Sequence, residues 1–289
     1  MICSCKTTKT SHSSSQTDVM LLEEFKDWQQ DRLTSLKSPF GWLSLTGLYW
    51  VKADSLTVGT HDGFDINLAH STSVNMGLLL RKDQGFYFRP GTGVQIKVEG
   101  KELTSEIELH HDQTGAPTIL NHESLFWYLI KREDNYGIRL KDTLNQSRLT
   151  QGPIPSFDFS PSMRKKAKVT WAEAKDSILI TNAQGVVSSN ALKGWLEFEH
   201  EGKEYQLAGT DGGNDVWFIV FGDETNSGET YGAGRFLYVP VTPGSETAIL
   251  DFNRAENPPC YFTAFATCPL PPKQNKLPIE IHAGEQSSH

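Results

Sequence analysis

A cluster of polar residues near the C-terminal end of the sequence carries the side chains best suited to chemistry. It comprises Glu229, Tyr231, Arg235, Asp251, Asn253 and Asn257. A guanidinium beside a carboxylate can clamp a planar anionic group, and two carboxylates can act as general acid and base. We therefore predict Glu229 and Asp251 as candidate catalytic residues. The candidate ligand-binding residues are Tyr231, Arg235, Asn253 and Asn257.

A hairpin of two strands is needed to position the first half of this cluster. The apolar segment Val216–Phe221 and residues 230–239 predict two antiparallel strands joined by a polar loop. Glu229, Tyr231 and Arg235 all have odd numbers, so on one strand they share a face. We therefore expect them to lie together near the mouth of the loop.

The second half of the cluster follows the next predicted strand. Asp251 ends that strand and begins a proline-stiffened loop, so we expect its carboxylate to meet Arg235 there. A structural interpretation is also open, and the sequence favours it: Arg235 pairs with Asp251 or Glu229 and ties the hairpin to the loop. Asn253 and Asn257 then form Asx turns.

Composition and motifs exclude several other chemistries. The formal net charge of −8 disfavours binding to the phosphate backbone of nucleic acids. His122-Glu123 begins like a zincin motif, but Phe126 stands at the position of the second histidine. An acidic turn at residues 211–215 resembles a calcium loop, but Gly222 replaces the glutamate at its twelfth position. The sequence contains no Walker loop, nucleophile elbow or complete dinucleotide fingerprint, so we predict no metal and no cofactor.

Two cysteines lie in the proline-rich C-terminal part of the chain. Cys260 and Cys268 lack the Cys-x-x-Cys spacing of zinc and redox motifs. In an exported protein they can pair, whereas in the cytosol they stay as buried thiols. The sequence favours the second, structural interpretation.

The N-terminus leaves two localisations open. Residues 2–5 resemble the end of a bacterial lipobox, with Cys5 as the lipid-attached residue and the Ser/Thr-rich stretch up to Thr17 as a tether. The chain is then a bacterial envelope lipoprotein whose signal segment lies upstream. Otherwise residues 1–17 are a disordered leader of a cytoplasmic protein. No apolar stretch approaches the roughly 20 residues of a transmembrane helix.

The remaining patterns predict a mostly β protein of two domains. Apolar residues recur every three to five positions over residues 18–38, which predicts an amphipathic helix that docks on the first sheet domain. Short strands separated by turn signals predict a β-sandwich over residues 40–145. A linker rich in Gly and Pro follows at 146–162. Residues 163–285 then form a second β-sandwich or barrel domain with a proline-rich wrap.

Long strings in the sequence resemble one known family. They lie at residues 228–237, 251–262 and 268–272, with further resemblance at 41–50 and 136–142. On these strings the chain, from about residue 21 to 284, resembles the domain of unknown function 1684 family. The resemblance implies kinship without an activity, because that family has no established function.

The N-terminal half also resembles a forkhead-associated β-sandwich. The resemblance rests on residues 56–59, 65–66, 77–78, 98–101 and 120–129. In that fold an arginine after a strand-ending glycine helps to hold phosphothreonine, but here Thr60 follows Gly59. Without the guanidinium, charge-assisted phosphate binding loses its main partner. The resemblance therefore implies the fold without phosphothreonine readout.

Two functions of different classes remain open. The first, which we prefer because no nucleophile–base pair is visible, is a non-enzymatic binding or scaffolding protein for a small molecule, glycan or peptide. The alternative is a metal-independent hydrolase or lyase that acts on a small anionic substrate. In that enzyme Glu229 or Asp251 is the base and Arg235 holds the anionic group.

Overall fold

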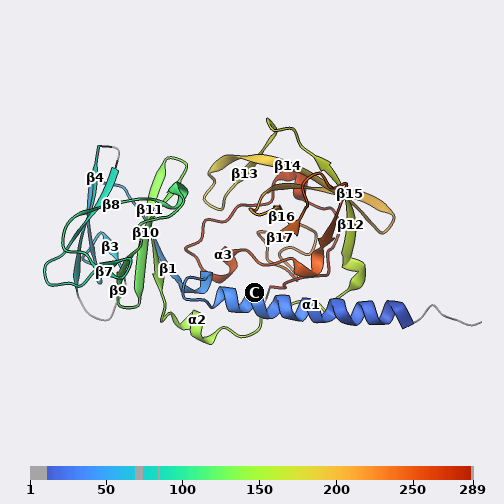
Figure 1. Cartoon of the computed structure of the whole chain (residues 1–289), viewed down its shortest axis with the longest axis horizontal. Helices are drawn as coiled ribbons and strands as arrows, with labels where there is room; N and C mark the ends of the chain where they lie inside the picture. Colours follow the sequence, from blue (N-terminus) through green and yellow to red (C-terminus); the bar gives the residue numbers. More distant parts are fainter. Residues whose placement is uncertain (1–11, 69–73, 84, 288–289) are drawn as a thin grey trace, which may run out of the picture. The chain divides into compact units, whose positions relative to one another are not determined.

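The structure, a computed structural model, describes residues 12–68, 74–83 and 85–287. Cys5 and its expected lipid attachment therefore lie outside the described residues. The chain divides into two compact units (Figure 1). Unit 1 contains the segment up to Thr34 together with Pro153–Tyr261 and the chain from Thr267 onwards, and unit 2 contains Ser35–Gly152 and Phe262–Ala266. Both units are built mainly of strands, which confirms the predicted mostly β, two-domain fold.

Unit 1 contains one antiparallel sheet that nearly closes on itself. The sheet order is β17-β16-β15-β14-β12-β18, and β13 pairs with β14. The edge strands β17 and β18 lie next to each other, as in a barrel. The strands are β12 (Arg164–Trp171), β13 (Ser177–Thr181), β14 (Val187–His200), β15 (Lys203–Asp211), β16 (Val216–Phe221), β17 (Arg235–Pro240) and β18 (Thr247–Asp251).

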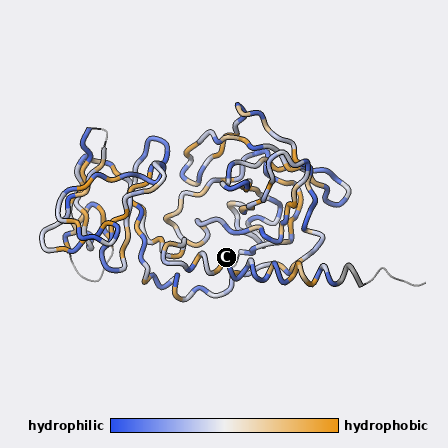
Figure 2. Tube along the Cα trace, in the orientation of Figure 1, coloured by the Kyte–Doolittle hydropathy of each residue, from blue (hydrophilic) through white to orange (hydrophobic). Residues whose placement is uncertain are grey.

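The core of unit 1 fills the inside of this sheet. Buried residues from several strands meet there, among them Leu196, Ile219 and Leu250. Strand β13 has one solvated face, and its buried Ile178 and Ile180 form a separate small cluster with Ala208. Phe221 and Phe252 pack edge-on with ring centroids 5.6 Å apart, and both are fully buried. The C-terminal tail completes the core with apolar residues such as Ile281 and Ala283. Figure 2 shows hydrophobic residues in orange and hydrophilic residues in blue interspersed along the trace.

The long helix α1 (His12–Leu36) belongs to unit 1 as far as Thr34. Phe25 is buried, and its ring lies 5.8 Å from Trp28 and 5.6 Å from Phe159. The expectation that the helix docks on the first sheet domain is therefore wrong for most of its length. Its aromatic face packs on the second sheet domain in sequence order, close to the C-terminal tail (Figure 1). No helix in the described ranges is long and apolar enough to cross a membrane.

Unit 2 is a sandwich of two sheets around a shared core. One sheet has the order β1-β11-β10-β9-β6-β7 and the other β3-β2-β4-β5-β8. Phe88 of one sheet and Trp127 of the other meet with ring centroids 5.9 Å apart, and both are buried. The strands are β1 (Leu45–Trp50), β2 (Ser55–Gly59), β3 (Ile66–Asn67), β4 (Asn75–Lys82), β5 (Gly85–Pro90), β6 (Lys97–Val98), β7 (Lys101–Glu102), β8 (Ile107–Leu109), β9 (Leu120–His122), β10 (Leu125–Arg132) and β11 (Asn135–Asp142).

Short helices connect the strands. In unit 2 these are η1 (Trp42–Ser44), η2 (Asp112–Thr114) and α2 (Gln146–Thr150), and in unit 1 they are η3 (Pro161–Met163), η4 (Phe252–Arg254) and η5 (Lys273–Asn275). A four-residue helix, α3 (Pro259–Phe262), follows η4. Gln146–Thr150 is thus helical, although this stretch was expected to be part of an irregular linker.

The predicted strand over residues 230–239 is too long at its N-terminal end. Strand β17 begins only at Arg235, because the preceding residues fold back into a turn. The amide of Thr230 donates to the carbonyl of Thr225 at 3.1 Å, and the amide of Gly234 donates to the carbonyl of Tyr231 at 3.0 Å. Gly234 has φ +84°, which breaks the extended backbone. The argument that places Glu229, Tyr231 and Arg235 on one strand face is therefore wrong.

Candidate functional site

Arg235 begins β17 and is fully buried. Its Nη2 atom lies 2.8 Å from Oδ2 of Asp223 and donates to the carbonyl of Ile281 at 3.0 Å, while Nη1 donates to the carbonyl of Ala283. Burial lowers the pKa of the guanidinium, and the Asp223 carboxylate opposes that shift. Arg235 thus pairs with a carboxylate, as expected, but not with either of the two that the sequence suggested.

Asp251 and Asn253 are the two predicted site residues that the structure brings together. An Oδ1 atom of Asp251 accepts from the backbone amide of Asn253 at 3.1 Å and from its Nδ2 at 2.9 Å, which caps η4. The buried Asn253 amide also bonds both backbone groups of Ser160 at 2.9 Å. These contacts tie η4 to the segment before β12. The expected Asx turn at Asn253 is replaced by one in which Asp251 is the acceptor.

Glu229 and Tyr231 point to different neighbours. The exposed carboxylate of Glu229 lies 3.0 Å from Nδ1 of His282, a surface contact of little energetic weight. The Tyr231 ring packs edge-on against Tyr261, and its hydroxyl bonds the thiol of Cys260. Among the described residues, no ion pair joins Arg235 to Glu229 or to Asp251.

Asn257, which is fully buried, belongs to a third group of contacts. Its backbone amide donates to Oε2 of Glu285 at 2.6 Å, and its side-chain Nδ2 donates to the carbonyl of Gln286 at 3.0 Å. Its backbone carbonyl accepts from Nη2 of Arg32 at 2.8 Å. Asn257 therefore holds α1 and the C-terminal tail together, and the same contacts lead to a charged cluster that the sequence analysis missed.

That cluster consists of one arginine between two carboxylates. Nε of Arg32 lies 3.1 Å from Oε1 of Glu285 and 3.3 Å from Oε2 of Glu256. The side chains of Arg32, Glu256 and Glu285 are only 11%, 12% and 2% exposed. Ionisable groups are buried in this way only where partners offset the loss of hydration. We call these three residues the Arg32 cluster.

Burial raises the pKa of both carboxyl groups in the Arg32 cluster. The pKa of Glu256 rises to about 7, because burial outweighs the attraction of Arg32 and Glu285 adds repulsion. The pKa of Glu285 is also raised by burial, against the opposing effects of Arg32 and of the Asn257 amide. Carboxyl groups with raised pKa values beside a pocket are characteristic of functional sites.

The Arg32 cluster is electrostatically joined to the Arg235 pair. Arg235 lowers the pKa of Glu285, so five charged groups alternate in sign from Glu256 through Arg32, Glu285 and Arg235 to Asp223. Three carboxylates and two guanidinium groups leave one excess negative charge when all are ionised. Protonation of Glu256 near neutral pH removes this excess; burial is the main cause of its raised pKa, and repulsion from Glu285 adds to it.

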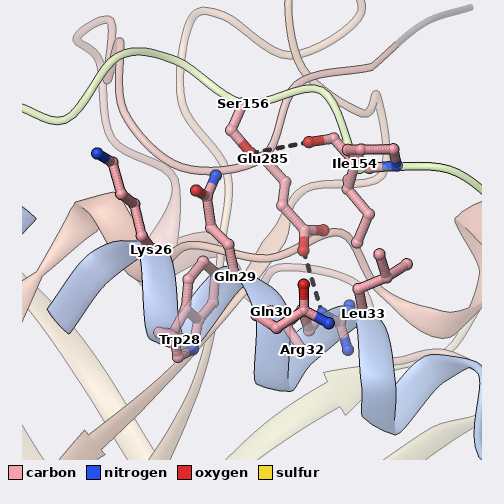
Figure 3. A pocket seen from close by; sticks show the side chains of 10 residues that line it. Lys26, Trp28, Gln29, Gln30, Arg32, Leu33, Ile154, Ser156 and Glu285 are labelled. Carbon is pink, nitrogen blue, oxygen red and sulfur yellow. Dashed lines mark hydrogen bonds and ion pairs between the residues drawn. The ribbon is translucent and has the colours of Figure 1, made fainter. Parts of the chain in front are cut away.

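A pocket of about 220 Å³ opens directly over the Arg32 cluster (Figure 3). We call it the α1 pocket. Lys26 and Gln29 extend from the helix on the side where Glu285 and Ser156 lie, while Arg32 meets Glu285 at the floor (Figure 3). The residues that line it are Lys26, Trp28, Gln29, Gln30, Arg32, Leu33, Pro153, Ile154, Ser156 and Glu285.

The wall of the α1 pocket opposite the helix is held by backbone hydrogen bonds. Ser156 and Glu285 form an antiparallel bridge, the amide of Phe157 donates to Gly284 at 3.0 Å, and the amide of Gln286 donates to Pro155 at 2.8 Å. The Ser156 hydroxyl donates to the carbonyl of Ile154 at 3.3 Å. These bonds hold the wall of the pocket in place, so the pocket needs little ordering to receive a ligand.

Two other hollows are less suited to be a site. One, of about 360 Å³ in unit 1, is bordered by Asp223, Gly232 and Lys276, but the Asp223 carboxylate is fully buried against Arg235. The other, of about 710 Å³ in unit 2, lies between Phe40, His110 and other residues, and is mostly apolar. In the described ranges no three His, Cys, Asp or Glu side chains gather as a metal-ligand set.

The α1 pocket could not be recognised from sequence spacing. Arg32 lies 253 positions from Glu285 and 225 from Asn257, so only the tertiary fold brings them together. Glu256 stands inside the loop that carries Asn253 and Asn257, and this nearby acidic residue was the one available signal.

The C-terminal part of the chain matches a family model. Residues 152–286 match the model described as "Protein of unknown function (DUF1684)". This segment is similar to the DUF1684 family. The match confirms the resemblance for this part of the chain, whereas the resemblance at residues 21–151 stays a prediction. The DUF1684 segment carries Arg235, Glu256 and Glu285, but Arg32 lies outside it on α1.

The chain is also similar to a solved structure, the solution NMR structure of an uncharacterized protein of Haloarcula marismortui. It is 26% identical, the similarity covers 49% of this chain and 81% of that one, and the TM-score is 0.42. No curated protein matches this chain. The match to DUF1684 brings no established activity to this chain.

Proposed function

We propose that this protein is a non-enzymatic binding protein whose site is the α1 pocket and whose ligand is a small polar molecule. The observation that carries the proposal is the nearly buried Arg32–Glu285 ion pair in the wall of a preformed pocket. Concave sites with a few fixed polar groups among apolar ones are the usual form of small-molecule sites.

The lining of the pocket defines the chemical class of the ligand. A volume of about 220 Å³ lies below the roughly 300–1,000 Å³ of drug-sized ligand sites, which favours a small metabolite. Gln29 and Ser156 offer hydrogen bonds, Trp28 offers a flat apolar surface, and Lys26 places a positive charge at the rim. We infer a ligand with several hydrogen-bonding groups, an apolar edge and at most one negative charge.

A thermal-shift screen tests this proposal. Small organic acids, amino acids and monosaccharides are added to the full chain at millimolar concentration, and the melting temperature is measured. We expect at least one of these classes to raise the melting temperature with a saturable dose response. Isothermal titration of the compound then gives the dissociation constant and stoichiometry.

Two variants of α1 locate the binding. Gln29→Leu keeps the size of a pocket residue but removes its amide, and should weaken binding by about tenfold or more, the value of one lost hydrogen bond. Asp27→Asn alters an exposed residue of the same helix that does not line the pocket, and should leave binding unchanged. Equal affinity in wild type and Gln29→Leu would contradict the site, and a screen without any hit would contradict the function.

The raised pKa values of Glu256 and Glu285 support a second candidate function, acid–base catalysis without a metal. In such a hydrolase or lyase Glu285 contacts the substrate, because it lines the pocket. This form of the enzyme is better supported than one built on Glu229 or Asp251, since neither bonds Arg235. If a compound found in the screen is converted, Glu285→Gln should slow turnover at least about a hundredfold while the product is followed by NMR.

The position of Thr60 in unit 2 supports the proposal that this protein does not bind phosphothreonine. Thr60 stands where the forkhead-associated resemblance requires an arginine, and it is buried. Its hydroxyl accepts from the amide of Val74 at 2.7 Å, so this position serves the packing of the sheet. We expect peptides with and without phosphothreonine to bind equally poorly, as measured by fluorescence polarisation.

A further inference from the structure

Cys260 and Cys268 lie in direct contact, outside the α1 pocket. Neither cysteine forms a disulfide in this structure; Cys260 is partly exposed in α3, and Cys268 is buried. The backbone amide of Cys260 donates to Sγ of Cys268 at 3.1 Å, and the two thiols share a hydrogen bond. Since the amide nitrogen is bonded to Cα at about 1.46 Å, Sγ of Cys268 lies within about 4.6 Å of Cα of Cys260. The two cysteines are therefore close neighbours in the fold, as a disulfide between them requires.

The surroundings of Cys260 favour its thiolate. Hydrogen bonds from Cys268 and from the Tyr231 hydroxyl lower the pKa of Cys260 to about 7, although burial acts in the opposite direction. The same contacts and burial raise the pKa of Tyr231 to about 12, so its hydroxyl keeps its proton and remains a donor. The edge-on contact with Tyr261, at 5.5 Å between ring centroids, holds the Tyr231 ring in place.

We propose that Cys260 and Cys268 form a reversible dithiol–disulfide site that reacts with low-molecular-weight disulfides such as glutathione disulfide. Cys260 is the attacking thiol, because it is the partly exposed one of the pair, and the buried Cys268 is the resolving thiol. Tyr231 is a positioning residue that holds the attacking sulfur. This site is independent of ligand binding in the α1 pocket.

The reaction balances in two exchange steps. The Cys260 thiolate attacks one sulfur of the small disulfide, forms a mixed disulfide and releases one thiolate. The Cys268 sulfur then loses its proton, attacks Sγ of Cys260 and releases the second thiolate. The protein gives up two electrons and two protons, and the small disulfide is reduced to two thiols. Excess thiol reverses both steps.

The resulting disulfide closes a short loop around residues 261–267. Within it, the segment Phe262–Ala266 belongs to unit 2, whereas the two cysteines belong to unit 1. The redox state of the two cysteines thus decides whether the ends of this loop are covalently joined. We expect the closed form to resist proteolysis within the loop more than the open form.

Mass spectrometry of the full chain tests the proposal. The double variant Cys3→Ser/Cys5→Ser is the background, so that only Cys260 and Cys268 can react. It is incubated with excess glutathione disulfide at pH 7, quenched with acid and measured intact. We expect the intact mass to fall by two hydrogens without a glutathione adduct. Peptide mapping should then show a disulfide between Cys260 and Cys268. An unmodified protein, or glutathione retained on both cysteines, would overturn the proposal.

Single substitutions in this background separate the roles of the two thiols. Cys268→Ser should stop the reaction at a mixed disulfide on Cys260, whereas Cys260→Ser should leave the buried Cys268 unmodified. Modification of Cys268 at an undiminished rate in Cys260→Ser would contradict the assignment of the attacking thiol. Adding Tyr231→Phe to Cys268→Ser should shift the pH profile of adduct formation to higher pH. The reaction at pH 7 should slow by about threefold, because a higher pKa leaves less Cys260 thiolate but makes that thiolate more nucleophilic. Identical pH profiles with and without the Tyr231 hydroxyl would contradict its role.

Discussion

Arg32 and Glu285 stand 253 positions apart in the sequence, yet Nε of one lies 3.1 Å from Oε1 of the other. Because Arg32 also contacts Glu256 and the carbonyl of Asn257, the arginine anchors α1 to the C-terminal tail and the loop after β18. The same contacts form the floor of the α1 pocket. Arg32 thus links the stability of the fold to the proposed binding site.

Removal of Arg32 should destabilise the protein strongly. Arg32→Gln leaves two nearly buried carboxyl groups without their cation, and we expect a loss of about 3 kcal/mol in the free energy of unfolding at pH 7.5. Urea denaturation followed by circular dichroism measures it. Asp27→Asn, on the same helix but exposed, is the control and should change stability by less than about 0.5 kcal/mol. Equal stabilities of both variants would contradict the role of the Arg32 cluster.

Stability should fall as the pH rises from about 4.5 to 7. The pKa of Glu256 is raised from 4.5 to about 7, so the folded state holds this proton more tightly than the unfolded state. Its contribution is fully present below pH 4.5 and is lost between about pH 4.5 and 7, by up to about 3 kcal/mol. Glu285 acts in the same direction. Glu256→Gln should flatten this part of the curve of unfolding free energy against pH, and an unchanged slope would contradict the assignment.

The strands were largely predictable because their pattern is local. Strand β16 has the bounds of the expected segment Val216–Phe221, since turn residues on both sides limit this apolar run. The start of β17 differs from the prediction because Thr230 and Tyr231 suit a strand, whereas the positive φ of Gly234 and the backbone hydrogen bonds of the turn interrupt it. The docking of α1 was missed because an amphipathic face shows that a helix packs, without showing on what.

The candidate site was less predictable than the fold. The sequence predicts that Arg235 pairs with a carboxylate, but nothing in it singles out Asp223, which stands in the predicted polar loop. The carbonyl groups of the tail residues Ile281 and Ala283 accept the remaining hydrogen bonds of the buried Arg235 guanidinium. Such partners are set by tertiary packing and leave no periodic signal in the sequence.

Asp223 and Asp251 should differ in their importance for stability. Asp223→Asn leaves the fully buried Arg235 without an anion and should cost about 3–5 kcal/mol. Asp251→Asn keeps one oxygen for capping η4 and should cost about 1 kcal/mol. Denaturant midpoints of the two variants at pH 7 measure the difference. A larger loss of stability for Asp251→Asn than for Asp223→Asn would contradict the assignment of Asp223 as the partner of Arg235.

Gly234 should tolerate a side chain poorly. It has φ +84°, and a Cβ atom there would lie 2.5 Å from the carbonyl oxygen of Phe221 and 2.5 Å from Pro271. We expect Gly234→Ala to lower the melting temperature clearly more than Gly213→Ala. Gly213 has a similar φ of +80° but nothing within 4 Å, so it carries only the backbone cost of about 1 kcal/mol. Equal shifts in the two variants would show that the turn before β17 can move aside.

Binding in the α1 pocket can be observed at Trp28, which lines it. In ¹⁵N-labelled protein, with the indole resonance assigned through Trp28→Phe, the compound from the screen is titrated and the shifts of all tryptophan side chains are followed. We predict a saturable shift of the Trp28 resonance, with the titration curve moved to about tenfold higher concentration in Gln29→Leu. A saturable shift at other tryptophans while Trp28 stays fixed would contradict the proposed site.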